Sequence, residues 1–271
     1  MNANRRKCSY CQQTSVLTNE HVFPECFSKT FNAITTTVTP TGEKAIASDL
    51  QIGDVCAICN NEKLSQLDIY LCYLNDLYFS KIIHAGDRVK FAHEPDKTLR
   101  TLLKIGFNVA RARKWPLEIW SDSESYILGS SPRPSGFRVF LQLMIPTPVG
   151  ETKLVFGRQA TEVPPMPMRV YSMDMAGFPG IEGGYSLSVW SYRFFILRES
   201  FLTPVGVRRM SIVKWLRNNW GAVELVQRRS QTLCASSVKV LEDAEGNSIF
   251  REQLNLVQKL KVKLEHKTPR R

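Results

Sequence analysis

Two cysteine pairs are the residues of this chain whose type and spacing point most directly to chemistry. Cys8 and Cys11 form one C-x-x-C motif, and Cys56 and Cys59 form a second one after a gap of 44 residues. Four thiolates are the preferred closed tetrahedral shell of structural Zn²⁺. A pair of redox motifs is the competing interpretation, but it requires a thioredoxin-like βαβ context that neither motif has. We therefore expect one shared structural zinc site, which leaves no open coordination position for activating water.

Between and beside the cysteine pairs lie residues suited to hydrolysis. Glu20 and His21 stand in the segment "EHVFP", and Asn60 directly follows Cys59. Carboxylate and amide oxygens are ligands that hard divalent cations prefer. A neutral imidazole can accept a proton from water near neutral pH. Glu20, His21 and Asn60 are therefore the residues of this region whose side chains could take part in such chemistry.

These motifs occur in a fixed order, C-x-x-C, then "EHVFP", then "CAICNNEK". In this order they resemble the HNH endonucleases, also called ββα-metal or His-Me finger nucleases, in their zinc-stapled form. The resemblance covers residues 8 to about 70, a quarter of the chain. The combination of motifs is specific to that family, whereas each motif alone would be weak evidence.

The resemblance implies a metal-dependent endonuclease that hydrolyses phosphodiester bonds of DNA, with RNA not excluded. His21 would be the general base, and Glu20 and Asn60 would hold one catalytic Mg²⁺ or Mn²⁺. The zinc-stapled start of a helix would set the direction of Asn60. Lys63, at the basic position of the family motif, would contact a substrate phosphate.

The chain also departs from the family pattern. The middle Asn of the family falls near Gln51, with Asp49 as the other candidate. Asn61 would replace Asn60 if the register differed by one residue. Asp68, on the following predicted helix, is an outside candidate for a ligand. The identity of the middle residue stays open at this point.

The net charge of +11 is unevenly distributed along the chain. Residues 1–85 carry 7 Lys/Arg and 8 Asp/Glu, whereas the other 186 residues carry 29 and 17. A predicted helix over 97–115 places Arg100, Lys104 and Arg111 on one face, which suits contact with phosphates. The alternative is an ordinary solvated helix face. A polyanionic partner would thus bind mainly through the second part of the chain.

Periodicity and turn residues predict an α+β protein. Its first part, residues 1–85, would be the HNH module, and residues 86–271 would form a basic α+β domain that positions nucleic acid or senses a ligand or partner. Alternating β-prone runs separated by Pro and Gly predict an antiparallel sheet. The predicted elements are an amphipathic helix over 60–83, strands within 116–200, and helices over 207–220 and 251–265.

The three remaining cysteines, Cys26, Cys72 and Cys234, are expected to be buried free thiols. An odd total of seven cysteines, four of them at metal-ligand spacing, argues against a secreted disulfide framework. The sequence has no long apolar run and no apolar stretch near its start. We therefore expect a cytoplasmic protein that does not bind membranes.

The principal alternative function is a non-catalytic zinc-finger module that binds nucleic acid or a protein partner. Such a module would have the same cysteines, and its basic surface would bind nucleic acid through counterion release. It would not require Glu20, His21 and Asn60 together. A partner protein or a homo-oligomer is compatible with either function, and phage defence is one of several biological settings that suit a nuclease of this kind.

Overall fold

The computed structural model of the protein describes most of the chain up to residue 235. The described residues are 5–30, 35–39, 42–46, 50–120, 122–155, 158–163, 165, 168–173, 178, 180–200, 205–225 and 230–235. Within them helices and antiparallel strands are mixed, in agreement with the predicted α+β class. No helix in this part of the chain has both the length and the apolar character needed to cross a bilayer.

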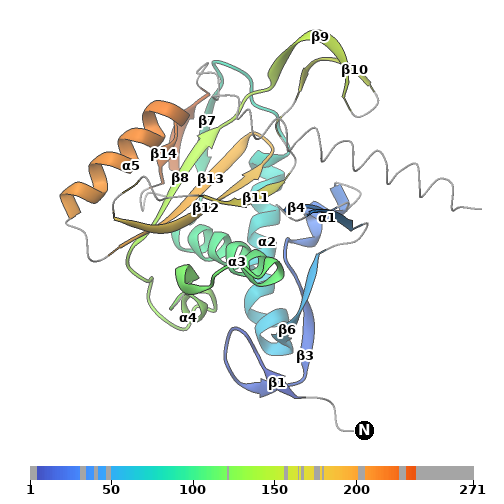
Figure 1. The fold of residues 1–271 in the computed structure, drawn as a ribbon, viewed down its shortest axis with the longest axis vertical. Helices are drawn as coiled ribbons and strands as arrows, with labels where there is room; N and C mark the ends of the chain where they lie inside the picture. Colours follow the sequence, from blue (N-terminus) through green and yellow to red (C-terminus); the bar gives the residue numbers. More distant parts are fainter. Residues whose placement is uncertain are drawn as a thin grey trace, which may run out of the picture.

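Two antiparallel strands followed by a helix form the N-terminal part (Figure 1). Strand β3 (Leu17–His21) pairs antiparallel with β6 (Gln51–Cys56), and a continuous helical segment begins at Cys59. That segment consists of a π-helical turn η1 (Cys59–Leu64), α2 (Ser65–Leu74) and a second π-helical turn η2 (Asn75–Phe79). The predicted helix over 60–83 is thus present. Shorter elements surround the strand pair of β3 and β6, namely β1 (Arg6–Lys7), β2 (Thr14–Ser15), α1 (Glu25–Thr30), β4 (Thr35–Thr39) and β5 (Gly42–Ile46). We call this strand pair the hairpin, although a long segment with α1, β4 and β5 joins its two strands.

Helix α3 (Pro95–Arg113) is the central helix of the protein. Twelve of its residues are buried, and they include the unbroken run from Thr101 to Ala110. A helix that is buried on all sides must lie between other elements rather than on a surface. It begins two residues before the predicted start at residue 97, and Glu94 takes the N-cap position. Pro95 follows it, since a proline in the first helical turn sacrifices no hydrogen bond.

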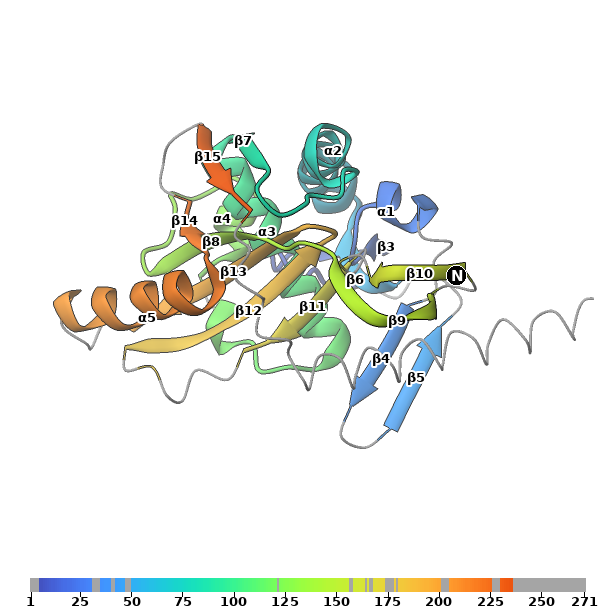
Figure 2. The same ribbon diagram turned by 90° about the horizontal axis from the view of Figure 1, so that it is seen from above.

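A five-stranded antiparallel sheet, in the order β11-β12-β13-β8-β14, forms the second part of the core. Alternate residues of its strands face opposite sides. On β13, Phe194 and Ile196 belong to the cluster that contains α3, whereas Phe195 and Leu197 pack with α5. Both views show α5 on the far side of the sheet from α2 (Figures 1 and 2). The elements are β8 (Phe137–Leu143), β11 (Arg169–Ser172), β12 (Ile181–Val189), β13 (Tyr192–Glu199), α5 (Val205–Trp220) and β14 (Val223–Glu224).

The remaining elements connect these parts. Strand β7 (Arg88–Ala92) pairs with β15 (Ser230–Cys234), and β9 (Thr147–Val155) pairs with β10 (Arg158–Val163). Two short helices, η3 (Glu118–Trp120) and α4 (Glu124–Ile127), follow α3. The predicted helix over 251–265 lies outside the described residues.

Gly106, in the middle of α3, packs closely against the rings of Trp120 and Tyr185. A Cβ at this position would lie 2.4 Å from Cη2 of Trp120 and 2.6 Å from Cζ of Tyr185. The Tyr185 hydroxyl also donates a hydrogen bond to the carbonyl of Leu102. A glycine in a helix costs about 1 kcal/mol relative to alanine. Gly106 lets the helix backbone pack against the rings of Trp120 and Tyr185, which a residue with a Cβ would overlap.

The two predicted domains share one hydrophobic core. Among the described residues, a single buried cluster includes Val55 and Leu67 from the first part and Phe91, Leu103 and Phe194 from the second. The predicted division near residue 85 therefore runs through a continuous core.

Cys26 and Cys72 form a disulfide between α1 and α2, which corrects the expectation that both are free thiols. Sequence alone could not reveal the pair, because 46 positions separate the two residues and only the fold of the chain brings α1 against α2. Cys234 lies at the end of β15, and its side chain is outside the described part of the structure.

Candidate functional site

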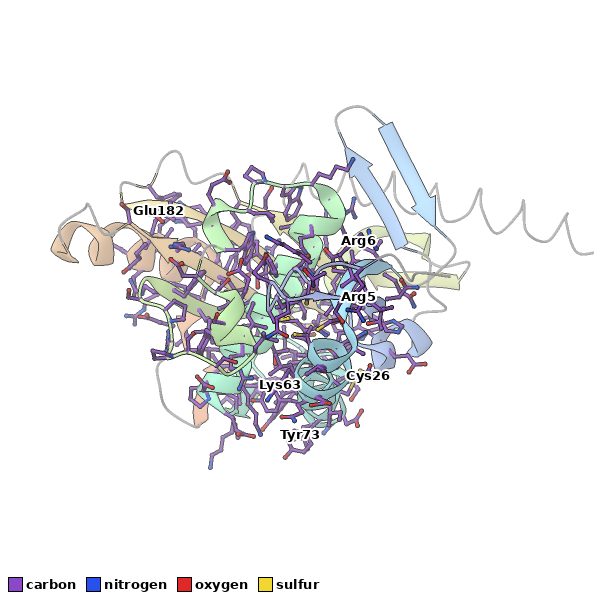
Figure 3. All side chains as sticks on the ribbon, turned by 90° about the horizontal axis from the view of Figure 1, so that it is seen from below. Arg5, Arg6, Cys26, Lys63, Tyr73 and Glu182 are labelled. Carbon is purple, nitrogen blue, oxygen red and sulfur yellow. A yellow bond between two sulfur atoms is a disulfide. The ribbon has the colours of Figure 1, made fainter. Side chains whose placement is uncertain are left out.

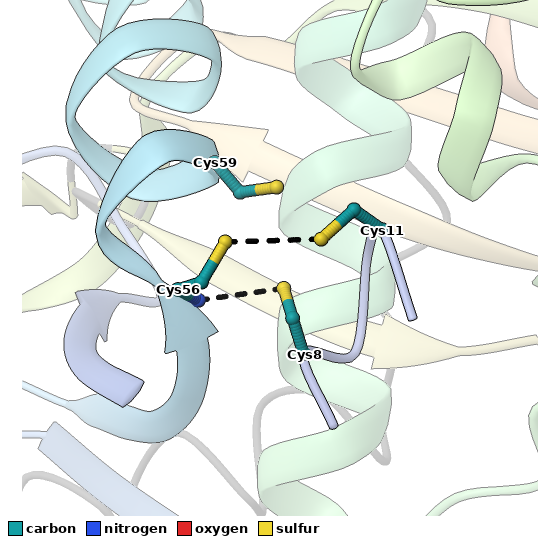
Figure 4. A group of neighbouring side chains, drawn as sticks. All are labelled: Cys8, Cys11, Cys56 and Cys59. Atoms are coloured by element: carbon teal, nitrogen blue, oxygen red, sulfur yellow. Dashed lines mark hydrogen bonds between the residues drawn. The ribbon is translucent and has the colours of Figure 1, made fainter. Parts of the chain in front are cut away.

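The four predicted zinc ligands lie together. The sulfur atoms of Cys8, Cys11, Cys56 and Cys59 are all within 4.8 Å of one another (Figure 4). The Sγ atoms of Cys11 and Cys56 are 3.8 Å apart. This separation matches a tetrahedral site, because Zn–S bonds of about 2.3 Å place the sulfurs about 3.8 Å apart. The cluster could thus hold one metal ion such as zinc, as the spacing predicted.

The surroundings of Cys8 favour its thiolate form. Burial opposes ionisation, but backbone N–H groups that point at the sulfur outweigh it and lower the pKa of Cys8 to about 7. One of them is the N–H of Cys56, which lies 3.3 Å from Cys8 Sγ. Burial and the neighbouring sulfurs instead raise the pKa of Cys59. A bound cation reverses that effect, because metal coordination requires and stabilises the thiolates.

The hairpin places His21 opposite Gln51. The two residues are cross-strand partners at the open end of the β3–β6 ladder. A register shift between Thr18 and Glu20 interrupts the pairing just before this point. Such bulges redirect side chains and are frequent beside functional sites. Of the two candidates for the middle residue of the motif, Gln51 is thus the neighbour of His21, whereas Asp49 lies outside the described residues.

Asn60, rather than Asn61, faces the hairpin. Its Nδ2 donates to the carbonyl of Asn19 at 2.8 Å and to Oγ1 of Thr18 at 3.0 Å. Asn61 is exposed. The amide of Asn60 therefore lies against the strand that carries His21, and its hydrogen bonds to that strand come from Nδ2 rather than Oδ1.

Glu20 points into the protein. Only 1% of the residue is exposed, and its Oε1 lies 2.7 Å from Nζ of Lys104. Asn108 donates to the same oxygen at 3.3 Å. Burial raises the pKa of Glu20, and the ammonium of Lys104 opposes this rise. The carboxylate is thus satisfied from within the chain.

Asp68 is the second carboxylate beside the same lysine. Lys104 Nζ donates to Asp68 Oδ1, so a single nitrogen joins the two carboxylates. Burial raises the pKa of Asp68, whereas Lys104 and the charge of His21 lower it. His21 therefore lies within electrostatic reach of Asp68. Asp68, which the sequence offers as a further candidate for a ligand, thus shares Lys104 with Glu20 beside His21.

A hydrogen-bonded network connects Glu20 and His21 to the first cysteine knuckle, Cys8 to Cys11. The Tyr10 hydroxyl, between the first two cysteines, donates to Asn108 Oδ1 at 2.6 Å. Nδ2 of the same amide donates to the carbonyl of His21 at 3.2 Å. Arg111 also donates to Asn108 Oδ1 and forms an ion pair with Asp54 at 3.2 Å. One amide thus links the metal-binding knuckle to the residue expected to be the base.

The sequence predicts that one face of the helix over 97–115 contacts phosphates, but most of this face is buried in the structure. The side chain of Lys104 is 0% exposed and that of Arg111 is 8% exposed. Arg100 is held by the carbonyl of Ile127 at 3.1 and 3.0 Å. These cations stabilise the interior because α3 lies between the hairpin and the sheet. Lys104 and Arg111 are thus not available to a nucleic acid in this structure, and Arg100 is partly exposed.

The sequence nevertheless contained a signal for this arrangement. Lys104, Asn108 and Arg111 follow one another at steps of four and three residues, which places them on one face of the helix. The remainder of the central part of α3 is apolar, so this polar stripe required polar partners within the protein. Those partners, Glu20 and Asp54, come from the hairpin.

Exposed cations near the hairpin are candidates for phosphate contact. Lys63 is exposed on η1, and Figure 3 shows it on the helix that also carries Tyr73. Arg5 and Arg6 are exposed at the start of the chain (Figure 3). Arg6 donates to the carbonyl of Gly53 at 2.9 Å, which places it beside β6. Arg5 and Arg6 were not singled out from the sequence.

The residues expected to hold a catalytic divalent ion do not fit one as they stand. Oε1 of Glu20 already accepts from Lys104 and Asn108, and the residue is almost fully buried. A divalent cation at this carboxylate would lie next to a buried ammonium, and like charges in a poorly solvated site repel strongly. Asn60 fits better, because only its Nδ2 is engaged with the strand.

Comparisons of the chain with protein-family models, with curated proteins and with solved structures find no match.

Proposed function

We propose that this protein is a metal-dependent endonuclease of the HNH type that hydrolyses phosphodiester bonds of DNA. One observation supports the proposal above the others. The β3–β6 hairpin carries His21 opposite Gln51, and the helical segment that follows presents Asn60 to the same strand. The cysteine cluster joins the two at the opposite end of the hairpin.

In the proposed reaction, His21 accepts the proton of the attacking water. Asn108 holds the main chain of His21 through its carbonyl, and Asp68 lies within electrostatic reach of the ring. Lys63 and Arg6, both exposed, would contact phosphates that flank the scissile bond.

Metal dependence is part of the proposal because a cation must neutralise charge at the scissile phosphate. Within the described part of the motif, Asn60 would offer this ion its side-chain oxygen, Oδ1, because its hydrogen bonds to the strand come from Nδ2. Glu20 becomes a ligand only if it separates from Lys104.

A cleavage assay tests the proposal. Plasmid DNA, single-stranded DNA and RNA are incubated with the zinc-loaded protein in Mg²⁺, Mn²⁺ or Ni²⁺. His21→Ala should lower the cleavage rate by at least about 100-fold, as expected for loss of a general base. His84→Ala is the matched control, because His84 is exposed and has no place in the site. Cleavage by His21→Ala at the wild-type rate would refute the assignment.

A non-catalytic zinc module is the second candidate, and one observation favours it. The ion pair of Glu20 with Lys104 explains a buried glutamate at that position without any reaction. This alternative predicts no cleavage of any substrate in any of the three metals, together with salt-dependent binding of nucleic acid or capture of a protein partner. Binding without cleavage by the wild-type protein would decide in its favour.

A further inference from the structure

Lys104 occupies the place of a cation between two carboxylates. Its Nζ lies 2.7 Å from Oε1 of Glu20 and also contacts Oδ1 of Asp68. The exposed fractions of the three side chains are 0% for Lys104, 2% for Glu20 and 23% for Asp68. A lysine ammonium is a compact point charge, so it can lie between two carboxylates as a metal ion would, although at longer distances from the oxygens. Two carboxylate oxygens around one cation are also an arrangement that divalent ions use.

The buried ammonium cannot share this position with a divalent ion. Both would draw on the carboxylate of Glu20, and their mutual repulsion would be little screened in a site from which water is almost excluded. Among the described neighbours of Glu20, Asp68 is the one other carboxylate that could offset an additional positive charge, and Lys104 already contacts it. The HNH-like pattern assigns Glu20 to the metal, whereas the fold assigns it to Lys104.

From this conflict we infer that Lys104 is a built-in cation that competes with a divalent metal ion for Glu20. This inference rests on the proposed function for one premise, namely that an ion binds near His21. The position of Lys104 between the two carboxylates does not depend on that function. Lys104 holds the two carboxylates on either side of one charge and thereby keeps the pair ordered without metal. A metal ion binds at Glu20 only where the ammonium is displaced or removed.

The exposure of the two carboxylates gives the competition a direction. Asp68 is partly open to solvent, whereas Glu20 lies behind the ammonium. An ion that arrives from solvent meets Asp68 first and reaches Glu20 only after Nζ has moved. Removal of the lysine charge should therefore open a site with two carboxylates.

Binding of Mn²⁺, followed by electron paramagnetic resonance of the free ion, tests the inference without a substrate. The protein is first loaded with zinc so that the cysteine cluster does not take up Mn²⁺. Four proteins are compared: wild type, Lys104→Met, Glu20→Gln and the double variant. Methionine keeps the length and the apolar stem of lysine and removes only the ammonium. Lys104→Met should bind Mn²⁺ at least tenfold more tightly than wild type, and Glu20→Gln in the same chain should abolish the gain.

Three outcomes of this experiment would overturn the inference. The first is an equal affinity of wild type and Lys104→Met for Mn²⁺. The second is a gain in Lys104→Met that survives Glu20→Gln, because the ion would then bind elsewhere. The third is a loss of Mn²⁺ affinity on Glu20→Gln that is as large in the wild-type protein as in Lys104→Met, because the ion would then reach Glu20 without competition.

Loss of a buried charge partner can prevent folding, so a second measurement is needed. The melting temperatures of Lys104→Met and Lys104→Gln are recorded with and without Mn²⁺. A ligand that binds only the folded state raises its stability. Mn²⁺ should therefore restore part of the lost melting temperature in both variants and change that of wild type much less. Should neither variant fold alone, refolding yield with and without Mn²⁺ gives the same comparison, and a yield that does not depend on Mn²⁺ counts against the inference.

The cleavage assay and the Mn²⁺-binding assay test separate claims, so either claim can be refuted while the other stands. Absence of cleavage by wild type in every metal removes the proposed function. Glu20-dependent Mn²⁺ binding in Lys104→Met would still support the competition between lysine and ion. Cleavage that depends on His21, combined with equal Mn²⁺ affinities, would support the function and refute the inference.

Discussion

Nδ2 of Asn108 lies 3.2 Å from the carbonyl oxygen of His21, so a residue of the central helix holds the main chain of the candidate base. The same side chain accepts the hydroxyl of Tyr10 at 2.6 Å. The first cysteine knuckle, the hairpin and α3 therefore meet at a single amide. This contact gives α3 a direct role in the geometry of the site, although it lies outside the family-like motif.

Asn108→Ala should destabilise the protein by about 2–4 kcal/mol, since it leaves several buried polar groups without a partner. Urea unfolding followed by tryptophan fluorescence measures the change. Asn61→Ala is the matched control, because Asn61 is exposed and such substitutions usually change stability by less than about 0.5 kcal/mol. Equal stabilities of the two variants would show that the network around Asn108 contributes little.

The cysteine cluster should bind one zinc ion per chain. Elemental analysis measures the stoichiometry, and replacement by Co²⁺ should give the visible absorption of a tetrahedral thiolate site. A strong chelator should lower the melting temperature, because ion binding contributes to folding free energy. Cys56→Ser should lose the ion, whereas Cys26→Ser, which alters only the disulfide, should retain it. Retention of zinc by Cys56→Ser would contradict the assignment.

The disulfide between Cys26 and Cys72 should stabilise the contact of α1 with α2. It closes a loop of 46 positions, for which chain entropy predicts a contribution of about 4 kcal/mol. The double variant Cys26→Ser/Cys72→Ser should be less stable by up to this amount in denaturant unfolding. Mass spectrometry after thiol alkylation without reductant tests the bond directly, since these two cysteines should stay unmodified. Their alkylation in the folded protein would show that the pair is reduced.

Gly106→Ala should destabilise the protein although alanine is the better helix former. The added methyl group would overlap with the rings of Trp120 and Tyr185, and overpacking of this kind costs about 1–3 kcal/mol. Thermal unfolding measures the loss.

Trp120→Phe supplies the control for Gly106→Ala, because phenylalanine lacks the part of the indole that the methyl group would meet. In a double-mutant cycle the second substitution should reduce the cost of Gly106→Ala by about 1 kcal/mol. Additive effects would mean that the overlap does not determine the cost.

The local elements and the cysteine cluster could be predicted from the sequence because both depend on short-range patterns. The spacing of Cys8, Cys11, Cys56 and Cys59 is sufficient for one tetrahedral ion, and the structure brings all four together. The helix that begins at Cys59, the helix over α3 and the antiparallel strands follow from hydrophobic periodicity and turn residues.

Only the tertiary structure decided which charges are buried. On a helical wheel, Lys104 and Arg111 appear as a solvated basic face, since the wheel contains no information about what packs against it. The fold places α3 between the hairpin and the sheet, so these cations must find Glu20, Asp68 and Asp54 within the protein. The Cys26–Cys72 pair and the ion pair of Glu20 depend in the same way on contacts between residues far apart in sequence. Spacing along the chain determines what a short motif can bind, whereas the free energy of burial determines which partner each charge actually has.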